Sequence, residues 1–231
     1  AIFLEQNHFP LVSVCVLAYK SSKTIHETLD SILIQDYPRI EILVTDDCSA
    51  DFDKKQIETY IKDKNHGNIV SLSVHCHEEN GGTVKNIEFA RTHASGEFIM
   101  YLAADDALFD STTVSQYMNA FSNAGEDVYM VCSLTAMSGS ELSDIRFFSP
   151  SREGVSLLQT ASPQKIFSYT SHTFTIPTTS NCIRTSLYTK IGGYDTENYF
   201  LIEDAPLFCR MLRAGIKPYW IPNMIGAYHR D

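Results

Sequence analysis

The stretch EFIMYLAADDALFD, residues 97–110, joins an apolar run to two adjacent carboxylates. Residues 97–102 have the composition of a buried strand, and Asp105 and Asp106 follow where that strand would end. Neighbouring carboxylates repel each other unless water or a cation offsets their charge. The stretch therefore predicts a buried strand with two acids at its end. Water or a cation must reach these acids to offset their charge.

Outward from this stretch, strand and helix patterns alternate. Apolar runs predict four more strands, at 11–17, 40–45, 69–75 and 128–134. Helical spacing predicts helices from 25 toward Pro38, near 53–63, over 83–94 and around 114–121. Thr24 and Glu27 have the spacing of a capping box at the first helix. This alternation indicates a mostly parallel, Rossmann-like α/β sheet flanked by helices on both faces.

The alternation ends near residue 135. Ser, Thr and Gly dominate as far as Ser180, so we expect an irregular half that packs against the first half rather than repeating it. A helix is predicted again over 204–214, with Gly215 as its C-cap, and a last strand over 217–221. We expect one domain over residues 1–231.

Composition and charge exclude some classes of protein. The 231 residues carry a net charge of −10, which disfavours nucleic acid as a partner because phosphate backbones are held by clustered Lys and Arg. No apolar run reaches the roughly 18 residues that span a bilayer, and the first residues show no signal-peptide pattern. Six cysteines without a CxxC pair suit a reduced protein. We expect a cytoplasmic location and leave peripheral attachment to a membrane open.

Two acidic pairs stand at predicted strand ends: Asp46 with Asp47, and Asp105 with Asp106. The carboxyl edge of an open α/β sheet is where ligands bind. A single such pair has an ordinary alternative, because Asp is also a good turn and N-cap residue. Two pairs on one edge favour a ligand site, and in an acidic chain a phosphate ligand would be small and bridged by a metal.

Three segments carry a resemblance: VSVCVLAYKSSKTIHETLDSILIQDYPRIEILVTDDCSAD, NGGTVKNIEFARTHASGEFIMYLAADD and IGGYDTENYFLIEDAPLFCRMLRAG. Together they resemble the family 2 glycosyltransferases, inverting enzymes of the GT-A fold that use nucleotide-sugar donors. The resemblance runs from about residue 10 to 222. It implies that about 10–134 binds the nucleotide sugar and that the irregular half, about 135–231, binds the acceptor.

The resemblance also implies a nucleotide site, formed by Ala18, Tyr19, Asp46, Asp47, Lys85 and Asp105. The family typically has Pro-Thr-Tyr-Asn after the first strand, and this chain keeps only Tyr19 of that block. A carboxylate in the second block would accept a hydrogen bond from the base. UDP is the expected nucleotide because it dominates the family, with dTDP and GDP left open.

The family usually shows Asp-x-Asp at the exit of the fourth strand, and this chain has Ala103 in place of the first Asp. The resemblance implies that Asp105, Asp106 and His229 hold Mn²⁺ or Mg²⁺ against the diphosphate, since hard cations prefer oxygen ligands. An exposed histidine near the chain end is the alternative for His229.

The resemblance implies a general base at the start of the predicted helix 204–214. Asp204 matches that base best, and its neighbour Glu203 is the second candidate for a catalytic carboxylate. The ordinary alternative is an acid stabilised by the helix macrodipole. The acceptor would be a saccharide or glycolipid in polysaccharide or glycoconjugate synthesis. Aromatic residues of the irregular half either face that acceptor or fill core: Tyr169, His172, Phe174 and Tyr188.

Three other functions stay open on the sequence. A degenerate member would bind a nucleotide sugar without turnover, which Ala18, Lys20 and Ala103 favour. A nucleotidyltransferase would usually carry a basic Gly-rich loop after the first strand, and AYKSSKT has no Gly. A phosphoacceptor signalling domain also gathers Asp at strand ends but would be about half this length. The sequence does not predict an oligomeric state.

Overall fold

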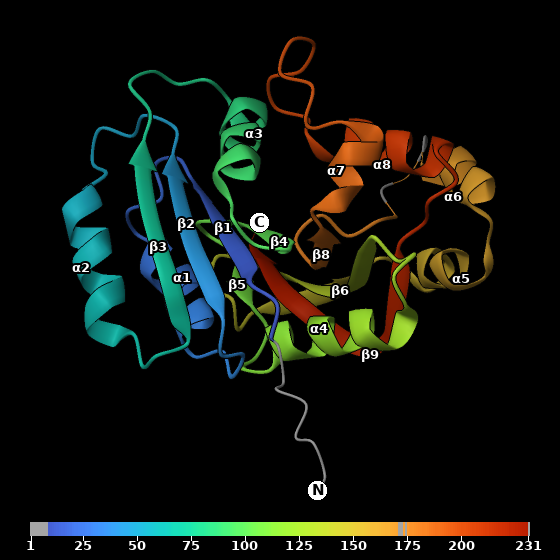
Figure 1. The fold of residues 1–231 in the computed structure, drawn as a ribbon, viewed down its shortest axis with the longest axis horizontal. Coiled ribbons are helices and arrows are strands. Elements are labelled where there is room, and N and C mark those ends of the chain that lie inside the picture. Colours follow the sequence, from blue (N-terminus) through green and yellow to red (C-terminus); the bar gives the residue numbers. More distant parts are fainter. Residues whose placement is uncertain (1–8, 171–172, 174, 231) are drawn as a thin grey trace, which may run out of the picture.

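Figure 1 shows a computed structural model of the chain, in which helices flank a long sheet. The structure describes residues 9–170, 173 and 175–230. The strands are β1 (Val12–Ala18), β2 (Ile40–Asp46), β3 (Ile69–Cys76), β4 (Phe98–Ala103), β5 (Ala107–Leu108), β6 (Met130–Ser138), β7 (Ile145–Ser149), β8 (Asn181–Arg184) and β9 (Tyr219–Arg230). The helices are α1 (Ile25–Leu33), α2 (Lys54–Lys64), α3 (Thr83–His93), α4 (Thr113–Ala124), α5 (Arg152–Thr160), α6 (Pro163–Thr170), α7 (Ser186–Ile191) and α8 (Asp204–Arg213).

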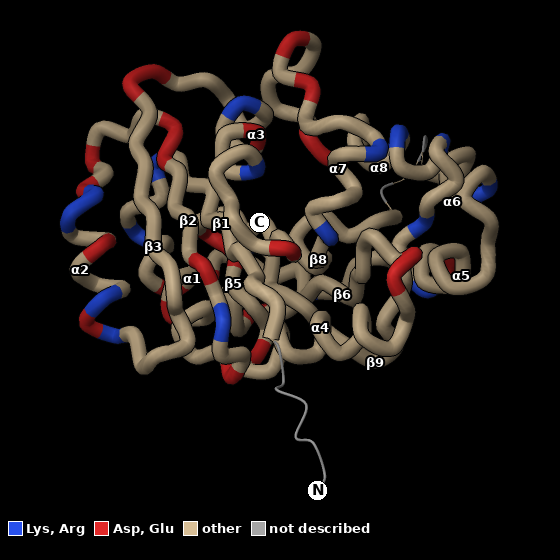
Figure 2. Tube along the Cα trace, viewed as in Figure 1, with Lys and Arg blue, Asp and Glu red and all other residues tan. Residues whose placement is uncertain are grey.

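The first half of the sheet is parallel, as the sequence predicts. β1 pairs with β2 on one side and β4 on the other, with Val12 opposite both Ile40 and Phe98, and β3 lies outside β2. Figure 2 shows charged positions mainly on helices and loops, and β1, β3 and β4 contain no Lys, Arg, Asp or Glu. β1 and β4 are buried on both faces, which is why they read as continuous apolar runs, whereas β3 lies at the edge of the sheet and exposes Val70, Ser71 and Cys76.

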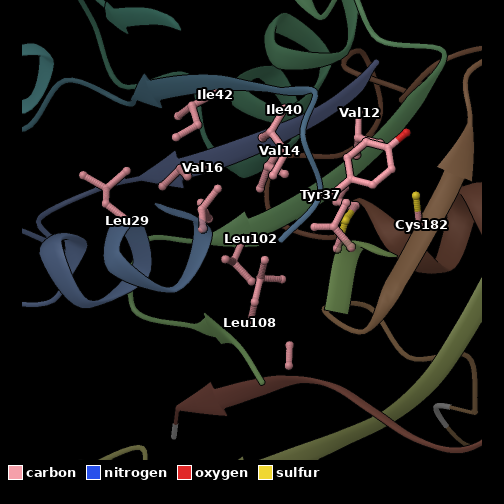
Figure 3. Close-up of a cluster of buried hydrophobic side chains, with 14 of the residues drawn as sticks. Val12, Val14, Val16, Leu29, Tyr37, Ile40, Ile42, Leu102, Leu108 and Cys182 are labelled. Atoms are coloured by element: carbon pink, nitrogen blue, oxygen red, sulfur yellow. The ribbon is translucent and has the colours of Figure 1, made fainter. Parts of the chain in front are cut away.

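Alternate residues of β1 belong to two separate cores. Val14 and Val16 pack in a cluster that includes residues of α1, α2 and α4, and Figure 3 shows Val14 beside Ile40 and Val16 closer to Leu29 of α1. Cys15, between them, packs in a second cluster with residues of α3 and α8. Successive side chains of a strand point to opposite faces. One apolar strand therefore holds helices on both sides of the sheet.

The second half of the sheet is mixed. The strand order is β3-β2-β1-β4-β8-β6-β9-β5, with β7 also beside β6. β8 pairs antiparallel with both β4 and β6, and β9 runs parallel to β6. One continuous sheet thus joins the two halves of the chain. No helix in the described part of the chain has the length and apolarity that a bilayer span needs.

The stretch between β6 and α8 carries more regular structure than the sequence predicts, although it does not continue the parallel repeat. It contains β7, α5, α6, β8 and α7. α5 and α6 each bury one large apolar side chain, Leu158 and Ile166. A single buried residue per helix leaves too weak a period to recognise in the sequence.

β9 is longer than its predicted span of 217–221, because it continues to Arg230. Pro222 and Asn223, the latter at φ +60°, interrupt the strand pattern in the sequence. Gly226 lies against α4, where an added Cβ would be 2.0 Å from the Tyr117 hydroxyl. The extension brings the end of β9, and with it His229, to the exit of β4.

The predicted capping box at α1 is wrong. The Thr24 hydroxyl donates to the carbonyl of Ala104 at 2.8 Å instead of capping the helix, and the Glu27 carboxylate accepts from the guanidinium of Arg230. Thr24 bonds to the exit of β4 and Glu27 to the end of β9, and local spacing does not reveal such distant partners. At α8 the prediction is confirmed: Gly215, at φ +78°, follows the last turn.

Candidate active site

A cavity of about 530 Å³ lies at the carboxyl edge of the parallel strands. Residues from the ends of β1, β4 and β9, the start of α3 and the segment before α8 line it. Most of the residues predicted from the sequence meet here: Ala18, Tyr19, Asp47, Asp105, Asp106, Glu203, Asp204 and His229. Asp46 and Lys85 do not line this cavity.

Asp47 is held against the start of α3. Its carboxylate accepts hydrogen bonds from the backbone N–H groups of Gly81 at 2.7 Å and Gly82 at 2.8 Å. Gly82 has φ +81°, and an added Cβ would lie 2.6 Å from the carbonyl oxygen of Phe200. Only glycine fits this crossing of two chain segments without strain. The pair of glycines therefore sets the position of Asp47 in the cavity wall.

Asp46, unlike Asp47, stabilises the turn after β2 and does not line the cavity. It is fully buried, and its carboxylate accepts hydrogen bonds from the backbone N–H and the hydroxyl of Ser49, both at 2.7 Å. These bonds close the turn after β2, in which Cys48 has φ +65°. Asp46 thus shapes the loop, and Asp47 is the acid of this pair that reaches the cavity.

α3 presents Asn86 to the cavity, while Lys85 is exposed beside Gly81 and does not line the cavity. The Asn86 amide donates to the carbonyl of Thr45 at 3.2 Å, and its oxygen lies 3.2 Å from Nε2 of His77. Adjacent residues of a helix point in directions about 100° apart. Lys85 and Asn86 both belong to the segment NGGTVKNIEFARTHASGEFIMYLAADD that carries the resemblance, but only the fold decides which of them lines the cavity.

The two acids after β4 have unequal surroundings. Asp105 is exposed at the cavity, and desolvation by the surrounding protein, followed by the charge of Asp106, raises the pKa of its carboxyl. Asp106 is 1% exposed and accepts hydrogen bonds from the Thr179 hydroxyl at 3.2 Å and the Arg230 backbone N–H at 3.0 Å. Internal donors therefore offset the charge of Asp106, and Asp105 remains the acid that faces a ligand.

β9 completes this corner of the cavity. Nδ1 of His229 lies 3.1 Å from Oδ2 of Asp106. The Arg230 side chain donates through Nε to the carbonyl of Asp105 at 3.0 Å and also reaches the Glu27 carboxylate. A histidine and an arginine from the last strand thus stand beside both acids.

The groups at this corner fit a hard divalent cation. A metal-binding histidine usually gives its other ring nitrogen to a carboxylate, and Asp106 occupies Nδ1 of His229 in this way. Among the described residues no cluster of three or more His, Cys, Asp or Glu is arranged to hold a metal. The protein would supply part of a coordination shell, of the kind that phosphate oxygens complete in Mg²⁺ and Mn²⁺ sites.

Asp204 is the first residue of α8 and Glu203 is its N-cap, and both lie partly buried in the cavity wall. Burial raises the pKa of both carboxyls, and the charge of Glu203 raises the pKa of Asp204 further. No described residue donates a hydrogen bond to the Asp204 carboxylate. A carboxyl with a raised pKa and no internal partner has the properties of a general base.

A second cavity of about 450 Å³ adjoins the first. The ends of β6 and β7 and the segments 175–178 and 201–205 line it. The two cavities have five lining residues in common: Thr178, Leu201, Glu203, Asp204 and His229. The acidic pair therefore lies where two separate ligands could meet.

Some residues of the site carry no signal in the sequence. Thr178 and Thr179 come from a stretch without periodicity or motif, and pairing with Asp106 is what brings Thr179 into the site. Among the aromatic candidates, Tyr188 is buried with its hydroxyl 3.1 Å from that of Tyr101, so it fills core. Tyr169 lines neither cavity. His172 and Phe174 lie outside the described residues.

Solved glycosyltransferases share this fold. The Staphylococcus aureus TarS fragment 1–349 in complex with UDP-GlcNAc superposes with a TM-score of 0.69 and 24% identity, over 96% of this chain and 58% of that one. The mannosyltransferase PcManGT from Pyrobaculum calidifontis, solved with GDP-Man and Mn²⁺, gives a TM-score of 0.70 and 20% identity, over 96% of this chain and 57% of that one. At these identities the likeness defines the fold, which is GT-A.

The sheet and these neighbours define the fold class as GT-A. The chain belongs to glycosyl transferase family 2, whose model matches residues 13–176. Poly(ribitol-phosphate) beta-N-acetylglucosaminyltransferase TarS of Staphylococcus aureus (strain Mu50 / ATCC 700699) is 37% identical over 103 residues, 43% of this chain and 17% of that protein. This chain spans between 17% and 38% of the length of the curated relatives it matches.

Proposed function

We propose that this glycosyltransferase moves one sugar from a nucleoside diphosphate sugar, with UDP as the nucleotide, to an acceptor hydroxyl with inversion, in polysaccharide or glycoconjugate synthesis. The observation that carries the proposal is the meeting of two cavities at Glu203 and Asp204. The first cavity would hold the nucleotide sugar, formed mainly by residues of about 10–134. The second would hold the acceptor, formed mainly by residues of about 135–231, within a single domain.

On the nucleotide side, Asp47 would accept a hydrogen bond from the base, with Ala18 and Tyr19 beside it. Asp47 suits this task because two backbone N–H groups hold its carboxylate in place. Asn86, rather than Lys85, would contact the nucleotide from α3, since Asn86 lines the cavity. TarS, solved with UDP-GlcNAc, and PcManGT, solved with GDP-Man, support a nucleotide-sugar ligand in this fold.

The diphosphate would lie at the corner formed by Asp105, Asp106 and His229. Asp105 and His229 would bind Mn²⁺ or Mg²⁺, and Asp106 would orient His229 through Nδ1. When bound, the cation offsets the charge that develops on the leaving diphosphate. Arg230, which donates a hydrogen bond to the Asp105 carbonyl, would fix the position of this corner of the cavity.

Asp204 would act as the base on the acceptor side. It would take the proton of the acceptor hydroxyl as the hydroxyl oxygen bonds to the anomeric carbon. The bond from that carbon to the diphosphate oxygen breaks, and UDP leaves with the electron pair. Attack from the face opposite the leaving group inverts the anomeric configuration, as in inverting hydrolysis with a sugar hydroxyl in place of water.

A second candidate is a non-catalytic protein that binds the nucleotide sugar. One observation favours it: Ala103 lines the first cavity at the end of β4, where the family usually carries an acid. Both candidates would bind the nucleotide sugar with Asp105 and Asp106 in place. The two candidates therefore differ only in turnover. Release of UDP from a donor sugar therefore separates them.

The test combines binding and turnover. UDP, dTDP, GDP and CDP are compared by thermal shift with and without Mn²⁺, because a ligand that binds the native state raises its stability. UDP-sugars are then incubated with the protein and Mn²⁺, and free UDP is measured. We expect the largest shift with UDP plus Mn²⁺ and a measurable release of UDP. A shift without any release would favour the non-catalytic candidate.

We also propose a cytoplasmic location, with peripheral contact to a membrane where the acceptor requires it. The six cysteines are unpaired in the structure, and Cys15, Cys132 and Cys182 are buried in the two cores. Free thiols in these positions suit a reducing compartment. Labelling of the protein with a thiol reagent after cell fractionation would test the location.

A further inference from the structure

An apolar run, residues 199–202, directly precedes Glu203 and Asp204. Tyr199, Phe200, Leu201 and Ile202 are consecutive and exposed, at 41%, 56%, 66% and 56% of their surface. Exposed apolar groups in one place commonly mark an interaction site, because removing apolar surface from water on binding is favourable. The backbone of the run is held at Phe200, whose carbonyl accepts a hydrogen bond from the N–H of Val84 at 3.2 Å. Its exposure is therefore part of the folded site.

Two residues of the run line the second cavity, and further apolar residues line it with them. Leu201 and Ile202 line this cavity together with Met137, Ile176 and Pro177. A volume of about 450 Å³ is in the range of small-molecule sites. The apolar residues and the acidic pair share one cavity, so a ligand that presents a hydroxyl to Asp204 would place its remaining part against them.

The charged side chains that line this cavity are acidic among the described Asp, Glu, Lys and Arg residues. No Lys or Arg lines it among the described residues, whereas Glu203 and Asp204 do. Figure 2 shows acidic but no basic positions along the loop between α7 and α8, which carries Asp195, Glu197 and Glu203. A polyanionic acceptor requires cations along its path. TarS is named for poly(ribitol-phosphate), and the charge of this cavity is unsuited to such a polymer.

We propose that the acceptor is an uncharged amphipathic saccharide: its reacting hydroxyl meets Asp204, and its apolar group lies in the second cavity against Leu201 and Ile202. This inference rests on the proposed function. It narrows the acceptor to a sugar that carries an alkyl or similar apolar group close to the reacting ring, and it sets this chain apart from enzymes that extend phosphodiester polymers.

The test uses octyl glycosides of neutral hexoses and N-acetylhexosamines, below the concentration at which they form micelles. The matching free sugars and poly(ribitol phosphate) are compared with them. The donor is the UDP-sugar that releases most UDP with Mn²⁺. We expect kcat/KM for the preferred octyl glycoside to exceed that for its free sugar by roughly tenfold or more, as burial of an alkyl chain predicts. Poly(ribitol phosphate) should accept no sugar.

Two matched variants complete the test. Ile202→Ser should lower the preference for the octyl glycoside over the free sugar by roughly fivefold to tenfold. Ile34→Ser is the control, because Ile34 is 57% exposed, close to the 56% of Ile202, and lines neither cavity. It should leave the preference unchanged.

Equal kcat/KM for octyl glycoside and free sugar would overturn the inference, as would preferred transfer to the polymer or an equal loss in both variants. UDP release to water without transfer to any octyl glycoside would also overturn it, and would leave the proposed glycosyltransferase activity standing. The absence of UDP release from every donor would instead contradict the proposed function itself.

Discussion

His229 and Asp106 are 123 residues apart in the sequence, and Nδ1 of the histidine lies 3.1 Å from Oδ2 of the carboxylate. The contact joins the last strand, β9, to the exit of β4. It explains how two adjacent acids are accommodated: Asp106 turns inward to internal partners, while Asp105 stays exposed at the cavity. The cation proposed for the diphosphate would therefore depend on both residues.

We expect Asp106→Asn to weaken the Mn²⁺-dependent part of UDP binding by about 10- to 100-fold, the usual effect of losing the carboxylate behind a ligand histidine. His229→Gln should do the same. Thermal-shift titration of Mn²⁺ at saturating UDP measures the effect. Asp63→Asn, an exposed acid on α2, is the control and should leave the titration unchanged. Unaltered Mn²⁺ dependence in both site variants would contradict the assignment.

Asp47→Asn should weaken free UDP and UDP-sugar by similar factors, because this residue is proposed to contact the base and not the sugar. Asn86→Ala should also weaken both ligands, whereas Lys85→Ala should change them little, since Lys85 does not line the cavity. Isothermal titration of each variant with UDP and a UDP-sugar provides the comparison. A larger loss for Lys85→Ala than for Asn86→Ala would show that the lysine side chain, and not the amide, reaches the nucleotide.

Gly82→Ala should destabilise the protein by about 1–3 kcal/mol, since it combines a positive φ with a clash against Phe200. It should also weaken UDP binding, because Gly82 holds the Asp47 carboxylate. Gly125→Ala is the matched control: Gly125 has φ +94°, and nothing lies within 4 Å of the added Cβ. Thermal unfolding and UDP titration should separate the two variants. Equal effects on UDP binding would argue against a role for the Phe200 contact.

Asp204→Asn should reduce sugar transfer by a factor on the order of 10²–10⁴, the usual contribution of a positioned base, with donor affinity nearly unchanged. Asparagine keeps the shape of the side chain but cannot take a proton. Glu203→Gln should cost much less, because Glu203 is assigned a supporting part. Single-turnover transfer and UDP-sugar titration measure the two quantities. If donor binding falls in step with transfer, Asp204 organises the donor site and Glu203 becomes the candidate base.

The raised pKa of Asp204 predicts how the stability of the folded protein changes with pH. The folded state holds this proton more tightly than the unfolded state, so the stabilisation is present at low pH. It is lost as pH rises from the ordinary carboxyl value near 4 toward the raised pKa. Asp204→Asn should therefore gain stability over the parent between pH 5 and 8, on the order of 1 kcal/mol or roughly 2–4 °C in Tm. A constant difference in Tm across this range would refute the shift.

The sequence by itself determined the parallel half of the sheet and the positions of its acids. Apolar periodicity is a local property, so β1, β2, β3 and β4 are recognisable without knowledge of their neighbours. Asp47, Asp105 and Asp204 come directly after strands or at a helix start, where parallel α/β architecture brings them to one edge.

Only the tertiary structure decided which member of two adjacent pairs faces the cavity. Asp47 rather than Asp46, and Asn86 rather than Lys85, line it, because one step along the backbone turns the side chain to another face. The full length of β9, the partners of Asp106 and the second cavity depend on pairings between segments far apart in the chain. Such contacts form only when the fold brings those segments together, so no local pattern of residues records them.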